Sequence, residues 1–145
     1  MTPRSFETQI GRNGCRALAT LMLWSAVVSA DTLKLIRKIP HSGYSEGLDY
    51  HQGYLWNALP KMIAKIDPKD GTVVQRFQPA TEYSESISWF KGEIWNLSFH
   101  DNGIYAGKLG KDAIQWEKRG THPEVHGWGI AHDGKQLILT GDYRN

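Results

Sequence analysis

Short hydrophobic segments separated by turn residues follow one another from Tyr44 to the end of this chain. No stretch beyond residue 30 keeps its apolar side chains at helical spacing. β-Branched and aromatic residues fill the segments, which favours strands. The first group predicts strands at residues 48–50, 54–57, 62–67 and 72–77. Pro68 and Asp70–Gly71 predict the last turn of this group, because Pro presets φ and Asp-Gly tolerates positive φ.

The same order of segments recurs further along the chain. A second group predicts strands at 87–90, 93–99, 104–109 and 114–117, and a third group opens with 129–131 and 136–140. Gly47, Ser86 and Gly129 hold equivalent positions, 39 and then 43 residues apart. A strand repeat of this length is typical of a propeller or a solenoid. We therefore predict an all-β fold, an incomplete β-propeller of about two and a half four-stranded blades.

The third group stops at Asn145 without its outer strands, so we expect a truncated copy of such a fold. Residues 31–43 carry spaced apolar side chains and are a candidate outer strand for the last blade of a complete ring. A partial ring leaves sheet edges that closure would otherwise hide.

The first thirty residues differ in character from the rest. Arg4, Arg12 and Arg16 precede an apolar run over 17–28, and Val28-Ser29-Ala30 supplies small residues before Asp31. This order predicts a signal peptide over 1–30, followed by a single domain over 31–145 that is periplasmic or secreted. The run is short for a membrane span, so no stable anchor is expected after cleavage.

Charge and cysteine content narrow the function classes. The single cysteine, Cys15, lies in the predicted leader, which leaves the exported part without disulfides, a thiol nucleophile or a cysteine metal site. Removing 3 of the 17 basic and 1 of the 15 acidic residues leaves 14 of each. The balanced charge gives no support for nucleic acid as a partner.

Three titratable residues precede the inner-strand segments. Glu46, Glu85 and His126 hold matching positions there, and in a propeller such positions face one shared channel. Glu85 is the candidate catalytic residue, because a partly desolvated carboxyl there would have a raised pKa and serve as acid and base. The alternative is a solvated loop glutamate or an acceptor that ties neighbouring blades together.

Two further features have competing interpretations. Most of the aromatic residues fit blade packing, but Trp128 lies between Gly127 and Gly129 and is a candidate wall of a substrate cavity. His122 and His126 are four residues apart, yet Pro123 and Gly127 favour a loop, and no third ligand is positioned. We therefore predict no metal site.

Several phrases resemble the plant and bacterial type of glutaminyl-peptide cyclotransferase, also called glutamine cyclotransferase. They are Tyr44-Ser45-Glu46-Gly47-Leu48, Tyr83-Ser84-Glu85-Ser86-Ile87, Asn96-Leu97-Ser98-Phe99 and His126-Gly127-Trp128-Gly129-Ile130 followed by Asp133-Gly134-Lys135. The resemblance runs from about residue 39 to residue 142 and covers about the first half of that family's five-bladed propeller.

The resemblance implies an activity and a set of residues. The family converts N-terminal glutamine of peptides or proteins to pyroglutamate with release of ammonia, an acyl transfer that needs no cofactor. Glu85 matches its catalytic glutamate. The implied substrate-binding residues are Tyr44, Glu46, Tyr83, Phe99, Trp128 and His126.

The chain also departs from the family pattern at three of these positions and at Ser86, the residue after Glu85. Glu46 replaces a glutamine, Phe99 a tryptophan, His126 a glutamate and Ser86 a glycine. These departures keep two alternatives open. One is a non-catalytic propeller that binds a ligand or a protein, and the other is a gene fragment that does not fold alone.

Overall fold

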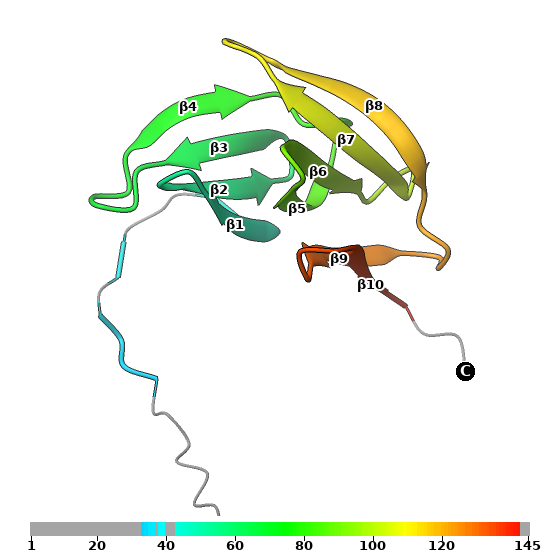
Figure 1. Cartoon of the computed structure of the whole chain (residues 1–145), viewed down its shortest axis with the longest axis horizontal. Helices are drawn as coiled ribbons and strands as arrows, with labels where there is room; N and C mark the ends of the chain where they lie inside the picture. The colour runs from blue at the N-terminus through cyan, green and yellow to red at the C-terminus, as the bar shows by residue number, and fades with distance from the viewer. Residues whose placement is uncertain (1–32, 37, 40–42, 143–145) are drawn as a thin grey trace, which may run out of the picture. The chain divides into compact units, whose positions relative to one another are not determined.

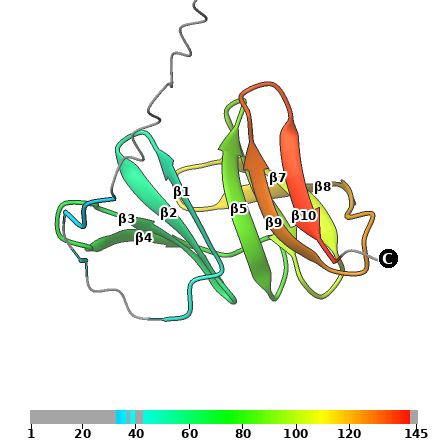
Figure 2. The ribbon, with the colours of Figure 1, turned by 90° about the horizontal axis from the view of Figure 1, so that it is seen from below.

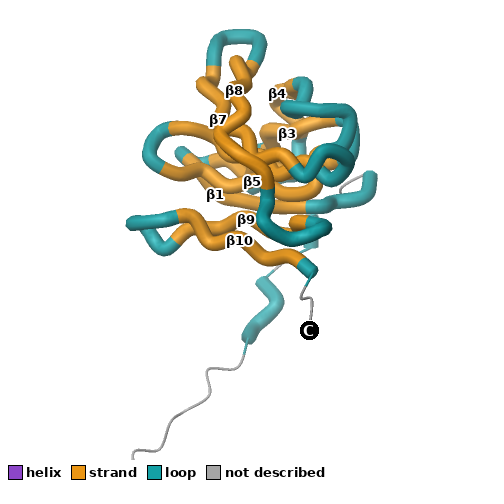
Figure 3. Tube along the Cα trace, turned by 90° about the vertical axis from the view of Figure 1, so that its right-hand side faces the viewer, coloured by secondary structure: helices purple, strands orange, loops and turns teal. Residues whose placement is uncertain are grey.

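The computed structural model describes residues 33–36, 38–39 and 43–142, and every regular element in them is a β-strand (Figures 1 and 3). By its contacts the chain divides into two units, Met1–Leu35 and Ile36–Asn145. The predicted signal peptide and Cys15 lie outside the described residues. The described part contains no helix long and apolar enough to cross a membrane.

The first sheet has four antiparallel strands in chain order. They are β1 (Gly47–His51), β2 (Tyr54–Leu59), β3 (Met62–Ile66) and β4 (Val73–Phe77). The tight turn between β1 and β2 places Gln52 at φ 49° and Gly53 at φ 84°. Two consecutive positive φ values match the right-handed twist of a hairpin. All four strands predicted for this group are confirmed.

The second sheet repeats this topology, and a two-stranded sheet follows it. The strands are β5 (Ser84–Phe90), β6 (Glu93–Ser98), β7 (Gly103–Leu109) and β8 (Ile114–Thr121), then β9 (Gly127–His132) and β10 (Leu137–Gly141). The turn between β5 and β6 repeats the first hairpin, with Lys91 at φ 51° and Gly92 at φ 81°. The repeat of up-and-down antiparallel sheets confirms the all-β fold of an incomplete, propeller-like type.

The first strands of the three sheets are neighbours, as Figure 2 shows for β1, β5 and β9. A Cβ added to Gly47 of β1 would come within 2.9 Å of Ser86 Cα on β5. The hydroxyl of Ser86 in turn accepts a hydrogen bond from the backbone N–H of Ile130 on β9, at 3.2 Å. Residues expected at equivalent places in the repeat therefore converge in space.

The main hydrophobic core joins the first and second sheets. Its central ring is Trp56 of β2, which is 1% exposed and lies 5.0 Å from the ring of Trp89 on β5. Ile63 and Ile94 are fully buried in the same cluster. The prediction that most aromatic residues serve blade packing is confirmed for Trp56 and Trp89.

Some predicted strands and strand boundaries differ from the structure. Of residues 31–43, the described ones form no strand. The inner strand of the second sheet begins at Ser84 rather than at 87, because Ser84 and Ser86 pair with Ser98 and Leu97 of β6. Polar residues open this strand, so the apolar pattern missed them. Glu85 therefore lies within the strand and not on a loop that leads to it.

Candidate functional site

Glu85 occupies a β-bulge at the start of β5. The pairing of β5 with β6 passes from Ser84–Ser98 to Ser86–Leu97, which leaves Glu85 as the extra residue. Bulges bend a strand and re-aim a side chain, and they recur beside active sites. Glu85 is only 7% exposed, so its carboxyl is largely withdrawn from water.

Trp128 occupies the corresponding bulge on β9. Gly127 pairs with Gly141 and Gly129 pairs with Thr140, so Trp128 is again the extra residue. The structure thus corrects one expectation: the residue equivalent to Glu85 is Trp128, while His126 lies in the loop before β9. The indole is 44% exposed, consistent with a ring that has small neighbours on both sides.

Glu46 and Tyr83 connect the first two sheets at this end of the inner strands. The Tyr83 hydroxyl donates a hydrogen bond of 2.5 Å to Oε1 of Glu46. This hydrogen bond, with lesser effects of burial and of the charges of Glu46 and Glu85, raises the pKa of Tyr83 to about 12. The phenol therefore stays protonated and remains a donor across the neutral pH range.

Glu46 also acts on the carboxyl of Glu85. Burial is the main cause that raises the pKa of its carboxyl, and the negative charge of Glu46 adds to the effect. Two carboxyl groups in unlike surroundings are suited to different roles. Glu46 accepts a hydrogen bond, whereas the raised pKa of Glu85 suits a carboxyl that takes up a proton and gives it back.

A continuous row of rings lies beside these carboxyl groups. Tyr83 contacts Phe99 at a centroid separation of 5.6 Å, and Phe99 stacks on His126 at 5.4 Å with 11° between the planes. Trp128 lies 5.6 Å from Phe99 and 5.7 Å from His126. We call Tyr83, Phe99, His126 and Trp128 the aromatic wall. The structure therefore brings together four residues singled out from separate parts of the sequence.

Asp142 holds one end of the aromatic wall. Its Oδ1 accepts a hydrogen bond of 2.6 Å from Nε1 of Trp128, and its Oδ2 lies 2.8 Å from Nδ1 of His126. The indole N–H and then the imidazole hold the pKa of Asp142 below its usual value. The backbone N–H of Asp142 also donates to the carbonyl of His126, at 3.0 Å.

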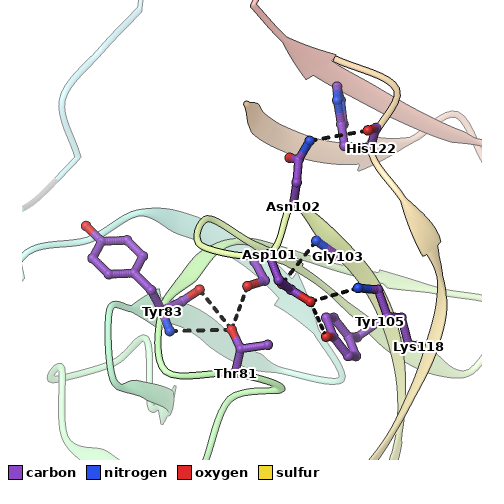
Figure 4. Close-up of polar contacts among 9 residues, drawn as sticks. Thr81, Tyr83, Asp101, Asn102, Gly103, Tyr105, Lys118 and His122 are labelled. Carbon is purple, nitrogen blue, oxygen red and sulfur yellow. Dashed lines mark hydrogen bonds and ion pairs between the residues drawn. The ribbon is translucent and has the colours of Figure 1, made fainter. Parts of the chain in front are cut away.

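The turn between β6 and β7 supports the loop before β9, and Figure 4 shows the contact of its Asn102 with His122. Asn102, at φ 52°, donates from Nδ2 to the carbonyls of His122 and Glu124. Its Oδ1 accepts from the N–H of Gly127 at 2.8 Å. One side chain thereby fixes the loop that carries His126.

Asp101 of the same turn anchors the segment that carries Tyr83. It receives hydrogen bonds from Lys118 at 2.8 Å and from the Tyr105 hydroxyl at 2.6 Å. Ser98 also contacts Asp101, and its hydroxyl lies 2.7 Å from the Thr81 hydroxyl. Thr81 in turn donates a hydrogen bond to the Tyr83 carbonyl (Figure 4). The turn thus connects both ends of the aromatic wall.

The comparisons with known proteins agree with this arrangement. A profile of the glutamine cyclotransferase family matches residues 14–142. The chain belongs to the glutamine cyclotransferase family. No curated protein matches the sequence significantly. The family implies peptide substrates, and the site described above takes Glu85, Phe99 and Trp128 from the phrases that carried the resemblance.

Two other candidate features have different outcomes. Tyr44 is 72% exposed and contributes no ring to the aromatic wall of this glutamine cyclotransferase family member. His122 is 5% exposed and packs against Gly127, with Nδ1 accepting from the N–H of Glu124 at 3.1 Å. Among the described residues no cluster of three or more His, Cys, Asp or Glu is arranged to hold a metal ion.

Sequence reasoning missed Asp142 and Asn102. Asp142 follows β10, and a lone acidic residue at a strand end gives no pattern that distinguishes it. Asn102 sits in an Asp-Asn-Gly turn, where the simplest expectation is a local role. Only the register of β9 against β10 brings Asp142 to the aromatic wall.

Proposed function

We propose that this chain is an exported glutaminyl-peptide cyclotransferase that converts N-terminal glutamine to pyroglutamate and releases ammonia. The observation that carries the proposal is Glu85, a buried carboxyl with a raised pKa at a β-bulge beside the aromatic wall. The family match supports the reaction class.

The reaction needs little beyond positioning and proton transfer. The α-amine of the substrate attacks the carbon of its own side-chain amide, and the five-membered lactam closes in one molecule. Holding the amine close to the amide carbon contributes much of the acceleration in such reactions, because binding has already restricted the motions that would keep the two groups apart. Glu85 accepts the proton that the attacking nitrogen loses and returns it to the departing NH₂, which leaves as ammonia.

The neighbours of Glu85 suit both the positioning of the substrate and the transfer of its proton. The aromatic wall offers flat apolar surface for the folded glutamine side chain and excludes water from it. Tyr83 and Glu46 form a polar boundary, and the charge of Glu46 adds to the burial that raises the pKa of Glu85. A carboxyl with a pKa closer to neutrality exchanges protons more effectively in both directions.

We also propose that the reaction takes place outside the cytoplasm. The sequence pattern of residues 1–30 supports cleavage by a signal peptidase and export to the periplasm or the medium. We propose that the substrates are exported peptides or proteins with an N-terminal glutamine.

The decisive experiment is turnover of a peptide that begins with glutamine. Mass spectrometry should show loss of one ammonia from the peptide with the wild-type chain. Glu85→Gln should slow this by roughly 10²-fold or more, since general acid–base catalysis contributes on that scale. Glu82→Gln is the matched control, because Glu82 is an exposed glutamate in the same segment. No release, or equal rates for all three proteins, would reject the proposal.

A second function is supported by the family departures. Glu46, Phe99 and His126 stand where the resemblance implies glutamine, tryptophan and glutamate, and these substitutions favour a binding module without turnover. A thermal-shift screen with peptides would then show stabilisation but no product. Trp128→Ala should abolish that stabilisation; retained binding would show that the ligand lies elsewhere.

A further inference from the structure

His126 and Asp142 form a carboxylate–imidazole pair that the proposed reaction has so far left unused. Oδ2 of Asp142 lies 2.8 Å from Nδ1 of His126. Among the described residues, Nε2 of His126 has no hydrogen-bond partner. The side chain is 42% exposed, so the ring is partly open to solvent and to a ligand.

The pair determines which ring nitrogen carries the proton. An ionised carboxylate only accepts hydrogen bonds, so Nδ1 must be the donor and Nε2 is left with a free lone pair. The indole N–H of Trp128 on Oδ1 and the imidazole on Oδ2 both favour the ionised form of Asp142. Stacking of the imidazole on Phe99, with 11° between the planes, fixes the orientation of the ring.

We infer that His126, oriented by Asp142, is a second proton-transfer group of the cyclisation reaction and accepts the proton of the substrate's α-ammonium group. This inference rests on the proposed function. A free N-terminus is largely protonated near neutral pH, and only the neutral amine is a nucleophile. The step that produces it requires a base, which the proposed role of Glu85 does not supply.

The protons balance as follows. Nε2 of His126 takes one proton from the ammonium, and the resulting imidazolium is stabilised by Asp142. The neutral amine then attacks the amide carbon, forming the new C–N bond. Glu85 carries one proton from that nitrogen to the leaving NH₂, the old C–N bond breaks, and ammonia departs. His126 finally loses its proton to water or to the ammonia.

Asp142→Asn separates this role from simple support of the wall. The asparagine Oδ1 can still accept from Trp128, so the indole keeps its hydrogen bond. The amide NH₂ now donates to Nδ1 of His126, which moves the proton of the neutral ring to Nε2. The variant thus reverses the tautomer while it leaves the packing in place. Since both side chains are about two-fifths exposed, the pair contributes little to stability.

The test combines tautomer and kinetics in the full chain. Long-range ¹H–¹⁵N correlation spectra, assigned with His126→Gln, should show the Nδ1–H form in the wild type and the Nε2–H form in Asp142→Asn. Asp142→Asn should lower kcat on a glutamine-initiated peptide by roughly 10²-fold, with a smaller change in KM and an unchanged melting temperature. Asp112→Asn, an exposed aspartate in the β7–β8 turn, is the control and should match the wild type.

The outcomes distinguish this inference from the proposed function. If the wild type is active and both Asp142→Asn and His126→Gln keep its kcat, only the role of the pair is overturned. An Nε2–H tautomer in the wild type overturns it as well. If the wild type releases no ammonia, the proposed function fails and the role of His126 in cyclisation fails with it. The spectra still decide whether Asp142 orients the ring.

Discussion

Gly47 offers a direct probe of how closely the innermost strands approach one another. A methyl group at this position would lie 2.9 Å from Ser86 Cα, 3.0 Å from Ile87 N and 3.1 Å from Ser86 Oγ. Ordinary carbon contacts lie at about 3.5–4.0 Å. Gly47→Ala therefore forces β1 and β5 apart by several tenths of an ångström, and two of the three obstructing atoms belong to the backbone.

The expected cost follows from this overlap. Overpacking against a fixed neighbour costs about 1–3 kcal/mol. In a domain of this size each kcal/mol lowers the melting temperature by roughly 4–8 °C. Urea unfolding followed by tryptophan fluorescence measures the free energy of unfolding directly, because Trp56 and Trp89 lie in the core between these sheets.

Gly120 supplies the matched control. It is also a strand glycine, on β8, but a methyl group there meets no atom within 4 Å. Gly120→Ala should be neutral or stabilise by up to about 1 kcal/mol, since alanine restricts the unfolded chain. Equal effects of the two substitutions would refute the close approach of β1 and β5, and with it the convergence of the repeat positions.

Three further predictions follow from individual contacts. Glu46→Gln should lower the pKa of Tyr83 from about 12 toward 10, measured by NMR of ring-labelled tyrosine; an unchanged value would mean that the hydrogen bond between them does not form. Burial alone would raise the pKa of Asp101, but its hydrogen bonds outweigh burial and hold that pKa far below its ordinary value. The ionised Asp101 should therefore stabilise the fold fully above the pKa it has in the unfolded chain, and this stabilisation should disappear as the pH falls through its pKa in the folded chain. Asp101→Asn should reduce stability at neutral pH and flatten the acid-unfolding curve. Parallel curves for the variant and the wild type would contradict this. Trp56→Ala should cost about 3–5 kcal/mol in the free energy of unfolding, because the ring is 1% exposed and contacts Trp89; a loss under 1 kcal/mol would place it outside the core.

The strands were predictable because their turns carry strong local signals. Two turns with positive φ, at Gln52–Gly53 and Lys91–Gly92, separate the strands on either side. In those strands the apolar residues either alternate with polar ones or follow one another directly. The repeat of Gly47, Ser86 and Gly129 then indicated which strands lie innermost. Local sequence and tertiary packing agree at these positions, which is what makes such an inference succeed.

The candidate site was predictable only in part. Glu85, Tyr83, Phe99 and Trp128 were recognised from short phrases, but the bulges that aim Glu85 and Trp128 depend on register. A bulge is decided by pairing with another strand, so the strand itself gives no sign of it. For the same reason His126 was assigned to the position that Trp128 holds, and the contact of Asp142 with both rings was missed.

The most direct test of the account compares the pKa of Glu85 with the pH dependence of turnover. Carboxyl ¹³C NMR should give a pKa above the ordinary value, and one limb of the kcat/KM profile should report the same group. Glu46→Gln should move both to lower pH together, while burial keeps the pKa of Glu85 above the ordinary value. A profile that stays fixed while the pKa of Glu85 moves would contradict the claim that this carboxyl carries the proton.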